Sequence, residues 1–386
     1  MRTQVGIVGA GPAGLTLAML LHQAGIETVV LEARDRAYVE NRVRAGLLEQ
    51  NTVDLMRELG VADRLDQEGL EHNGIYLRYH DHNHYVDMAA LTGRHITIYG
   101  QQEVVKDLTE ALLDRGVPVR FEVSDVALHD IETDHPRITY TYDGQADELT
   151  CDAIAGCDGF HGVSRPLIAE HITEYEYVYQ FGWLGILAEA PPATDELIYA
   201  WHEDGFALYT MRSQEISRLY LQVDADEDID HWPDDRIWSE LHARLGSVNA
   251  GRIFDKGITP MRSYVAEPMQ HGRLFLAGDS AHIVPPTGAK GLNLAVNDVR
   301  ILAPALTELI RNGKTERADG YTDAALNRVW RAQDFSNYMT QMLHDLGDGA
   351  FQRQVQLARL GYVDRSEAAA RSLAENYVGL PAEPEF

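Results

Sequence analysis

The chain has 386 residues, of which 33 are Lys or Arg and 60 are Asp or Glu, so its formal net charge is −27. This acidic balance argues against nucleic-acid binding, because phosphate recognition needs clustered basic side chains. With 45% hydrophobic and 24% charged residues, the composition predicts a large core divided over two or three packed units. No run of about 18 apolar residues suggests a membrane span, and a strand pattern at residues 3–8 leaves no room for a signal peptide. We therefore expect a cytoplasmic protein.

The hydrophobic pattern predicts the main elements in chain order. A strand at residues 3–8, a helix at 12–24 and a strand at 27–31 predict a parallel, right-handed βαβ unit. Alternating polar and apolar residues predict an antiparallel sheet in the middle of the chain, with strands at 196–201, 205–212 and 218–223. Later patterns predict a strand at 273–277 and helices at 302–309 and 324–346. The expected fold class is α/β with α+β elements: a Rossmann-like βαβ domain, a mostly antiparallel sheet and a helical C-terminal part.

The two cysteines, Cys151 and Cys157, lie in one strand-like run. An extended chain would separate them by roughly 20 Å, too far for a disulfide or a shared metal ion. We expect two free core residues in a reducing compartment and no metal site. The spacing also excludes the dithiol flavoenzymes.

A glycine-rich turn lies between the first predicted strand and helix. It reads Gly9-Ala10-Gly11-Pro12-Ala13-Gly14, and Glu32 stands at the end of the next strand. Glycines at these positions permit a tight turn and close approach of the backbone to a pyrophosphate, while Glu32 can accept a hydrogen bond from a ribose hydroxyl. In this context the motif predicts dinucleotide binding, with NAD and FAD both open.

Two later segments carry Asp158 and Asp279 after apolar strands. They read Ala155-Gly156-Cys157-Asp158-Gly159 and Leu276-Ala277-Gly278-Asp279-Ser280-Ala281-His282. Each by itself can be an ordinary turn at a strand end. Together with the glycine-rich turn, and in this order, they resemble the motifs of the class A flavoprotein monooxygenases. The resemblance implies that the dinucleotide is FAD and that both aspartates contact it.

Further segments narrow the resemblance to the members of this family that hydroxylate 4-hydroxybenzoate to 3,4-dihydroxybenzoate. The matching segments cover residues 42–50, 154–162, 181–185, 285–294 and 375–381. The resemblance implies a single-component enzyme that uses FAD, NADH or NADPH, and O2, acts through a flavin C4a-hydroperoxide, and forms a homodimer. It also implies a domain organisation: an FAD-binding domain at 1–172 and 269–300, a substrate-binding sheet at 173–268, and a helical interface region with a tail at 301–386.

Four residues of the predicted middle sheet are candidates for an anion site. Thr210 and Arg212 share a face of one strand, and Arg218 and Tyr220 share a face of the next. If residues 213–217 form the loop of a hairpin, Arg212 lies opposite Arg218 and Thr210 lies opposite Tyr220. Facing arginines are destabilising unless an anion lies between them, although a solvated charged face is the plainer alternative.

For the same four residues, the resemblance implies specific roles. Thr210, Arg212 and Tyr220 would hold the substrate carboxylate, Arg212 through its planar fork, and Arg218 would lie beside the flavin. Thr210 replaces the Ser usual in the family, which keeps the hydroxyl and narrows the pocket by a methyl group.

At the other end of the substrate, hydroxylation needs a phenolate, because electron release from the oxygen makes the neighbouring ring carbon nucleophilic. The resemblance implies that Tyr199, Tyr377 and His72 form a proton relay and that the Pro286 carbonyl accepts a hydrogen bond from the substrate hydroxyl. Without the resemblance, Tyr199 would be a core residue of a strand, Tyr377 would pack the tail, and His72 would be a surface-loop histidine. Trp201 departs from the small polar residue of relatives and can change the outer wall of the pocket.

The resemblance also implies further cofactor contacts. Lys290, with the helix that starts nearby, would lie at the pyrimidine side of the flavin, where negative charge develops on reduction. The other implied flavin contacts are Arg42, Arg44, Ala45, Gly46, Leu47, Gln101, Gly291, Leu292 and Asn293. The implied nicotinamide contacts are Ala33, Arg34, Tyr38, Arg42, Arg44, His161, Arg165 and Arg262. For the arginines, charges on a helix surface are the alternative.

The segment after Glu32 departs from strictly NADPH-dependent relatives. Ala33 stands where they have an Arg, and Asp35 would repel a 2′-phosphate, although Arg34 or Arg36 can compensate. We therefore expect NADH use, or use of both nucleotides.

Three other functions remain open at this point. An FAD-dependent oxidoreductase or dehydrogenase that does not activate oxygen would not need Tyr199, Tyr377 and Pro286. A non-catalytic FAD-binding protein would not need the arginine pocket. The third alternative is a monooxygenase acting on a related hydroxylated aromatic acid.

Overall fold

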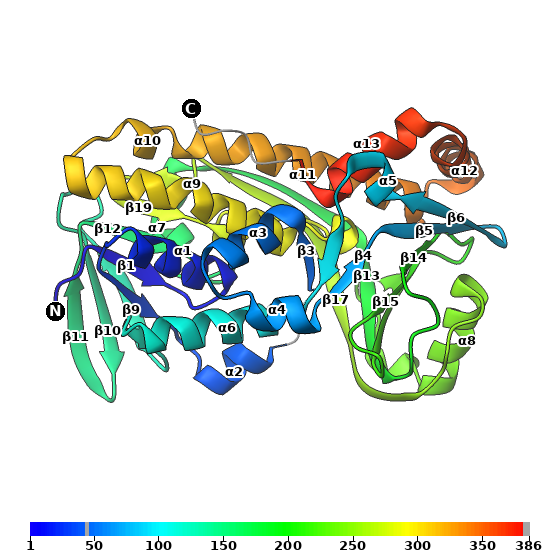
Figure 1. The fold of residues 1–386 in the computed structure, drawn as a ribbon, viewed down its shortest axis with the longest axis horizontal. Helices are drawn as coiled ribbons and strands as arrows, with labels where there is room; N and C mark the ends of the chain where they lie inside the picture. Colours follow the sequence, from blue (N-terminus) through cyan, green and yellow to red (C-terminus); the bar gives the residue numbers. More distant parts are fainter. Residues whose placement is uncertain (43–45, 381–386) are drawn as a thin grey trace.

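The computed structural model describes residues 1–42 and 46–380 (Figure 1). Over these residues, no helix combines the length and the apolar character that a membrane crossing requires. Cys151 and Cys157 are free and buried, which confirms the expectation of two unbridged core residues.

The predicted βαβ unit forms the centre of a six-stranded sheet. β1 (Val5–Val8), α1 (Pro12–Gln23) and β2 (Thr28–Leu31) follow one another, and β1 pairs in parallel with both β2 and β12. The strands are fully buried, as in a parallel sheet covered on both faces. The strand order is β18 (Gln270–His271), β19 (Leu274–Leu276), β12 (Ala153–Gly156), β1, β2 and β8 (Val119–Arg120).

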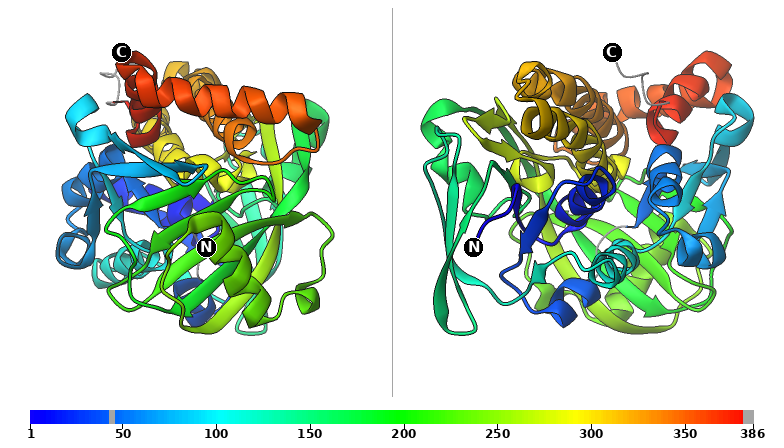
Figure 2. Two further views of the ribbon diagram at one scale, coloured as in Figure 1. Left: turned by 90° about the vertical axis from the view of Figure 1, so that its right-hand side faces the viewer. Right: turned by 60° about the vertical axis from the view of Figure 1, so that its left-hand side comes forward.

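The two faces of this sheet are covered differently. α1 packs between α6 (Gln101–Asp114) and α9 (Gly291–Asn312) on one face (Figure 1). A three-stranded sheet covers the other face and stands at one end of the molecule (Figure 2). Its strands are β9 (Ser124–His129), β10 (Arg137–Tyr142) and β11 (Gln145–Thr150). Gly6 of β1 allows this packing, because a Cβ there would lie 2.6 Å from Ile138 of β10.

The predicted antiparallel strands belong to an eight-stranded sheet. β14 (Leu197–Ala200), β15 (Ala207–Met211) and β16 (Ser217–Asp224) confirm the predicted strands, although β14 and β15 are shorter than expected. The strand order is β20 (His282–Ile283), β17 (Arg252–Glu267), β13 (Thr173–Glu189), β16, β15, β14, β5 (Gly74–Tyr79) and β6 (His82–Asp87). The pairing is antiparallel except between β14 and β5, so the sheet also draws on residues early in the chain.

The register of the β15–β16 hairpin differs from the prediction. Thr210 lies opposite Arg218, so the expected pairing of Arg212 with Arg218 and of Thr210 with Tyr220 was wrong by two residues. The turn is tighter than assumed, because the Arg212 N–H donates to the Ile216 carbonyl at 2.8 Å. The Ser213 hydroxyl oxygen accepts from two backbone N–H groups within that turn.

Long helices form the C-terminal part, as predicted. α9 and α11 (Tyr321–Leu343) run side by side, and α12 (Gly349–Arg365) and α13 (Glu367–Val378) follow (Figures 1 and 2). α13 shares a hydrophobic core with β14, which brings Tyr377 beside Tyr199 although 178 residues separate them.

The remaining elements are short. A small sheet has the order β3 (Leu47–Glu49), β7 (Ile96–Ile98) and β4 (Leu70–His72). The other α-helices are α2 (Arg36–Asn41), α3 (Gln50–Glu58), α4 (Asp63–Glu68), α5 (Met88–Thr92), α7 (Ser164–Leu167), α8 (Asp234–Leu245) and α10 (Glu316–Asp319). The 3-10 helices are η1 (Ala169–His171), η2 (Ile229–His231), η3 (Gly278–Ser280) and η4 (Pro286–Gly288).

Candidate active site

The glycine-rich turn lies at the carboxyl end of β1, and two of its glycines are dictated by close packing. Gly9 has φ +104°, and a Cβ there would lie 2.3 Å from the Cys157 carbonyl oxygen. At Gly14 a Cβ would lie 2.0 Å from the Gly9 carbonyl oxygen. Because β1, β12 and β19 are parallel neighbours, this turn meets the segments that carry Asp158 and Asp279.

The space beside this turn suits a dinucleotide. Gly11 precedes the first turn of α1, and a Cβ on it would meet no atom within 4 Å. The backbone N–H groups that open α1 can therefore be reached by a phosphate. Ala13, by contrast, is packed: a Cβ on Gly278 would lie 3.3 Å from its methyl group. FAD is the dinucleotide that the sequence predicts, and this cradle can accept its pyrophosphate.

Glu32 supports the glycine-rich turn through hydrogen bonds to the backbone. Its two carboxylate oxygens accept from the Ala10 N–H and the Arg34 N–H, each at 2.8 Å. A carboxylate oxygen has more than one acceptor position, so a ribose hydroxyl can still donate to Glu32.

Asp158 and Asp279 lie at the ends of β12 and β19. One carboxylate oxygen of Asp158 accepts from the backbone and the hydroxyl of Ser164 at 2.9 Å, while the other is buried without a partner among the described residues. Burial raises the pKa of Asp158. An unpaired buried oxygen is costly, and a ribose or a bound water can satisfy it. Asp279 is exposed at the same edge of the sheet.

The sequence analysis missed Asp298, which positions the Asp279 segment. Its buried carboxylate accepts from the Gly278 N–H at 2.8 Å and pairs with His282 at 2.7 Å. Burial alone would lower the pKa of His282, but Asp298 raises it. Only the Asp-after-Gly motif was visible in the sequence, since Asp298 lies in the middle of a helix.

The expected flavin contacts around β3 lie close together. A Cβ on Gly46 would lie 2.6 Å from the Gly100 Cα, which places Gly46 next to Gln101 at the start of α6. The Asn293 amide is used inside the protein, donating to the Leu47 carbonyl at 3.0 Å and accepting from the Glu49 N–H at 2.9 Å. Gly291 borders open space, and Leu292 is partly buried. Arg44 and Ala45 lie outside the described residues.

Lys290 makes two contacts inside the protein that the sequence analysis did not predict. Its buried ammonium donates to Glu49 at 2.6 Å and to the Tyr377 carbonyl at 2.8 Å. Burial alone would raise the pKa of Glu49, but Lys290 and Arg328 hold it below its usual value. This buried charge cluster fixes the backbone that carries the Tyr377 side chain.

The candidate substrate residues share one face of the eight-stranded sheet. Tyr199 lies opposite Leu208, which lies opposite Tyr220, and Thr210 lies opposite Arg218 in the next row. The corrected register therefore keeps Thr210, Arg212, Arg218 and Tyr220 on the same face as Tyr199.

This face is cationic and poorly solvated. Burial lowers the pKa of Arg212 to about 10, with Arg218 adding to the shift and Tyr220 opposing it. The Arg218 guanidinium lies over the Tyr220 ring at 5.2 Å, and two of its nitrogens are buried without a partner among the described residues. The Thr210 hydroxyl donates to the Met211 carbonyl at 3.2 Å and retains its acceptor positions. Two guanidinium groups beside a hydroxyl form a site that fits a carboxylate.

Two tyrosine hydroxyls meet at one end of this face. The Tyr199 and Tyr377 oxygens are 2.6 Å apart, and both side chains are buried. Burial raises the pKa of both phenols, so both carry a proton at neutral pH. The Pro286 carbonyl accepts from the Ala289 N–H at 2.9 Å and has a second lone pair for another donor.

His72 belongs to a buried polar group rather than to a surface loop. It lies in β4 with 1% of its surface exposed, and its Nδ1 is 2.7 Å from a Glu196 carboxylate oxygen. The Tyr85 hydroxyl donates to Glu196 at 3.2 Å. Besides burial and Tyr199, Glu196 is among the causes that raise the pKa of Tyr377. Glu196, which the sequence analysis missed, therefore contacts His72 directly and acts electrostatically on Tyr377.

The predicted nicotinamide residues form two groups. In the first, Ala33 precedes a segment in which the Arg34 and Arg42 guanidiniums lie 5.3 and 5.7 Å from the centre of the Tyr38 ring. In the second, Arg165 and Arg262 lie over the Phe160 ring at 4.2 and 4.9 Å. The His161 ring contacts the same Phe160 ring edge-on.

Trp201 directly follows β14, two residues after Tyr199. Its indole N–H donates to the Gln356 side chain of α12 at 2.8 Å, and its side chain is buried. Trp201 therefore connects the end of β14 to the C-terminal helices.

Comparison with known proteins is consistent with this site. Residues 2–336 match a family model described as an FAD binding domain. The chain is 46% identical to p-hydroxybenzoate hydroxylase of Acinetobacter baylyi over 99% of this chain and 96% of that protein. Two solved structures show the same fold at lower identity. The p-nitrophenol 4-monooxygenase of Pseudomonas putida DLL-E4 is 20% identical with a TM-score of 0.83, over 99% of this chain and all of that one. The anhydrotetracycline hydroxylase OxyS of Streptomyces rimosus is 22% identical with a TM-score of 0.79, over 98% of this chain and 76% of that one.

Proposed function

Because the chain belongs to the FAD-dependent monooxygenase family that includes p-hydroxybenzoate hydroxylase, we propose that it converts 4-hydroxybenzoate into 3,4-dihydroxybenzoate. It consumes NAD(P)H and O2 in doing so. The observation that carries the proposal is the hydrogen-bonded pair of buried hydroxyls, Tyr199 and Tyr377, on the sheet face that also carries two arginines. A dehydrogenase that does not activate oxygen would have no use for this combination.

In this proposal the cationic face orients the substrate. Arg212 binds the carboxylate through two N–H donors, supported by the hydroxyls of Thr210 and Tyr220. With the carboxylate held there, the ring hydroxyl reaches the Tyr199 end of the same face. Orientation by an ion pair is what distinguishes a hydroxybenzoate from an uncharged phenol.

The tyrosine pair removes the proton from the substrate hydroxyl. Tyr199 accepts that proton while passing its own to Tyr377, so neither phenol needs to ionise for long. The Pro286 carbonyl holds the substrate hydroxyl in place. We propose that Glu196 and His72 continue the path; their hydrogen bond and the electrostatic effect of Glu196 on the pKa of Tyr377 support this role.

FAD, when bound, supplies the hydride acceptor and the site of oxygen activation. We propose that its pyrophosphate lies at Gly9 and Gly11, its ribose at Glu32 and its ring system beside Arg218. Two features support these positions: the open space at Gly11, and two guanidinium nitrogens of Arg218 that have no partner within residues 1–42 and 46–380.

We further propose a division of labour along the chain. Residues 1–172 and 269–300 bind FAD, residues 173–268 bind the substrate, and residues 301–386 form a homodimer interface with the tail. Three large side chains of the last region support the interface, because Trp330, Phe351 and Tyr362 are exposed. The two unbridged cysteines agree with a cytoplasmic location.

The function is tested by following NADH and NADPH oxidation with and without 4-hydroxybenzoate, in air and under anaerobic conditions, with the products identified. We expect substrate-dependent O2 uptake and formation of 3,4-dihydroxybenzoate. Substrate-independent oxidation without a hydroxylated product would favour the dehydrogenase alternative. If the protein hydroxylates a related aromatic acid but not 4-hydroxybenzoate, that acid is the substrate.

The homodimer is tested by measuring the molar mass in solution for the wild type, Trp330→Glu and Phe351→Glu. We expect a mass of two chains for the wild type and a shift toward one chain in at least one variant. A wild-type mass of one chain at micromolar concentration would exclude the dimer.

A further inference from the structure

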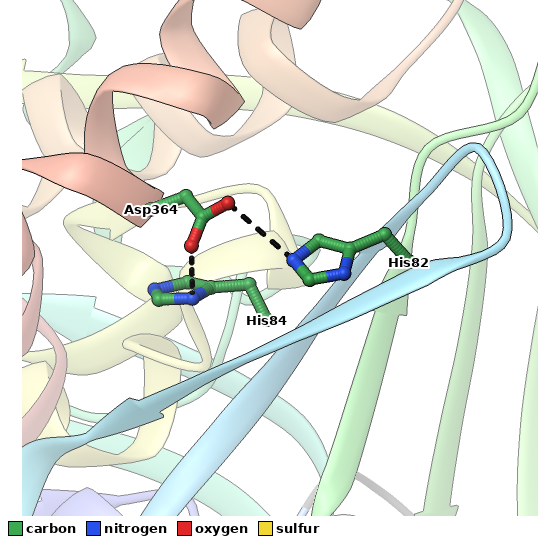
Figure 3. Close-up of side chains that lie close together, drawn as sticks. All are labelled: His82, His84 and Asp364. Atoms are coloured by element: carbon green, nitrogen blue, oxygen red, sulfur yellow. Dashed lines mark ion pairs between the residues drawn. The ribbon is translucent and has the colours of Figure 1, made fainter.

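Three side chains of a kind that bind metal ions converge between the β5–β6 hairpin and α12 (Figure 3). His82 and His84 alternate along β6, so both point to the same side of the hairpin. Asp364 reaches them from the last turn of α12. Its Oδ1 is 2.7 Å from Nδ1 of His84, and its Oδ2 is 3.4 Å from Nε2 of His82, so each histidine faces a different carboxylate oxygen. None of the three belongs to the residues proposed for hydroxylation.

We propose that His82, His84 and Asp364 bind one divalent transition-metal ion of the Zn²⁺ type, with water completing the coordination. Bonds of about 2.0–2.1 Å in a tetrahedral site place ligand atoms roughly 3.3 Å apart. The His82 nitrogen already has this spacing from Asp364. The His84 contact must open by about 0.6 Å, which is within the reach of a side-chain rotation.

The surroundings of the three ligands hold them in place. The Tyr79 hydroxyl donates to Asp364 Oδ2 at 2.8 Å, an outer hydrogen bond of the kind that orients metal-binding carboxylates. The Tyr79 ring also contacts the His82 ring edge-on, with 5.5 Å between ring centres. Two imidazoles and a carboxylate favour Zn²⁺, Co²⁺ or Ni²⁺ over Mg²⁺ and Ca²⁺, which prefer oxygen ligands alone.

A second group of similar residues provides a contrast. Glu132, His171 and His271 also approach one another, but the two imidazole rings are stacked with 3.7 Å between centres and 6° between planes. Ring nitrogens bind along the ring plane, so stacked rings direct their lone pairs along parallel planes instead of toward one point. We therefore assign the metal to the first group only.

A metal ion at this position would join the hairpin to α12, the helix that leads into α13 and Tyr377. An ion that binds only the folded protein stabilises it by mass action. At saturating Zn²⁺ we expect the midpoint of thermal unfolding to rise by roughly 2–5 °C.

The test uses FAD-loaded protein without an affinity tag. Zn²⁺ binding is measured by calorimetry and Co²⁺ binding by visible absorption, for the wild type, Asp364→Asn, His82→Asn and the control Glu132→Gln. We expect one Zn²⁺ per chain in the wild type and in the control. Both site variants should bind at least tenfold more weakly, and Mg²⁺ should give no heat.

Three results would overturn the proposal. They are the absence of saturable Zn²⁺ binding to the wild type, wild-type affinity in both site variants, and loss of affinity in Glu132→Gln. His82 is exposed, so its substitution keeps the test valid even if Asp364→Asn fails to fold. Flavin absorbance and circular dichroism check folding in each variant.

Discussion

Two arginines, Arg212 and Arg218, lie on the face of the eight-stranded sheet that carries Tyr199, and both are largely withdrawn from solvent. Arg218 has buried nitrogens without a partner among the described residues, and burial holds the pKa of Arg212 near 10. A buried guanidinium loses solvation, and a bound anion is one acceptor that can restore it. This loss of solvation supports the proposal that the face binds the carboxylate of the substrate.

Arg212→Ala should weaken the binding of 4-hydroxybenzoate by about 10- to 150-fold. The loss corresponds to roughly 1.5–3 kcal/mol for a hydrogen-bonded charge pair. Titration of the flavin absorbance with substrate measures the dissociation constant. Arg212→Lys is the matched control and should recover part of the affinity, since it keeps the charge without the planar fork. Unchanged binding in the alanine variant would remove Arg212 from the site.

Tyr199→Phe should separate flavin reduction from hydroxylation. The variant keeps the arginine face, so substrate binding and flavin reduction by NAD(P)H should continue. Without an acceptor for the substrate proton, the ring stays a poor nucleophile and the reduced oxygen should leave as H2O2. The readout is 3,4-dihydroxybenzoate formed per NAD(P)H consumed, with peroxide assayed in parallel. A variant that still converts nearly every NAD(P)H into product would rule out this role for Tyr199.

Glu196→Gln should slow proton release from the bound substrate by about tenfold or more, because a positioned acid or base typically contributes 10²–10⁴-fold. The substrate dissociation constant should change less than twofold, since Glu196 is not among the residues proposed to hold the carboxylate. Stopped-flow absorbance of phenolate formation separates the two effects. Glu71→Gln is the matched control. Glu71 lies on the same strand as His72, but its carboxylate pairs with His95, at 3.3 Å, and is not part of the proposed proton path. Equal rates in the wild type and Glu196→Gln would limit the relay to the tyrosines.

Among the elements, α2 bears most directly on the choice of nicotinamide nucleotide. Asp35 caps this helix by accepting from the Tyr38 N–H at 2.7 Å, and Arg36 pairs with Glu40 at 2.6 Å. The Asp35 carboxylate is therefore held at the start of α2, and the Arg36 guanidinium is already paired with the Glu40 carboxylate. Both features disfavour a 2′-phosphate at this end of the helix.

NADH should support turnover at a rate comparable to or better than NADPH. Ala33→Arg should raise the ratio of kcat/KM for NADPH to that for NADH by about tenfold, since a charge-assisted contact with phosphate contributes roughly 1.5 kcal/mol. Steady-state kinetics with both nucleotides measure the ratio. Arg36→Gln tests the compensation: a strong NADPH preference in the wild type that this substitution abolishes would show that Arg36 rebuilds the phosphate site.

At the scale of the whole molecule, His344 joins the eight-stranded sheet to the C-terminal helices. It is fully buried, and its ring stacks on Phe206 with 4.2 Å between ring centres. Its Nε2 accepts from the Trp183 indole N–H at 2.8 Å, which requires the neutral imidazole. Burial lowers the pKa of His344 from about 6.5 to about 3.

The free energy of unfolding should therefore fall as the pH drops below 6.5. Between pH 6.5 and 3 the unfolded state binds a proton at His344 that the folded state does not, so the loss reaches about 2 kcal/mol at pH 5. Above pH 6.5 the group contributes no pH dependence. Urea denaturation of the wild type and His344→Gln at pH 7 and pH 5 isolates this residue, because other titrating groups cancel in the difference. Equal pH dependence in the two proteins would contradict the assignment.

Local sequence was sufficient for much of the fold and for the family. The βαβ start, the three strands around Tyr199 and the long C-terminal helices follow from hydrophobic periodicity, because that pattern reports which face of an element is buried. The glycine-rich turn was predictable for a similar reason: Gly9 and Gly14 have no room for a side chain. Motif order then sufficed to identify the flavoprotein monooxygenases.

Only the tertiary structure decided how distant segments combine. The hairpin register goes with a tight turn in which the Ser213 hydroxyl accepts two backbone hydrogen bonds, and periodicity does not detect such a turn. Glu196, Asp298 and the Glu49–Lys290 pair act through partners far away in the sequence, and no local pattern marks them. The same holds for His82, His84 and Asp364. Burial, pairing and pKa are properties of three-dimensional neighbours, so the chain order alone could not determine them.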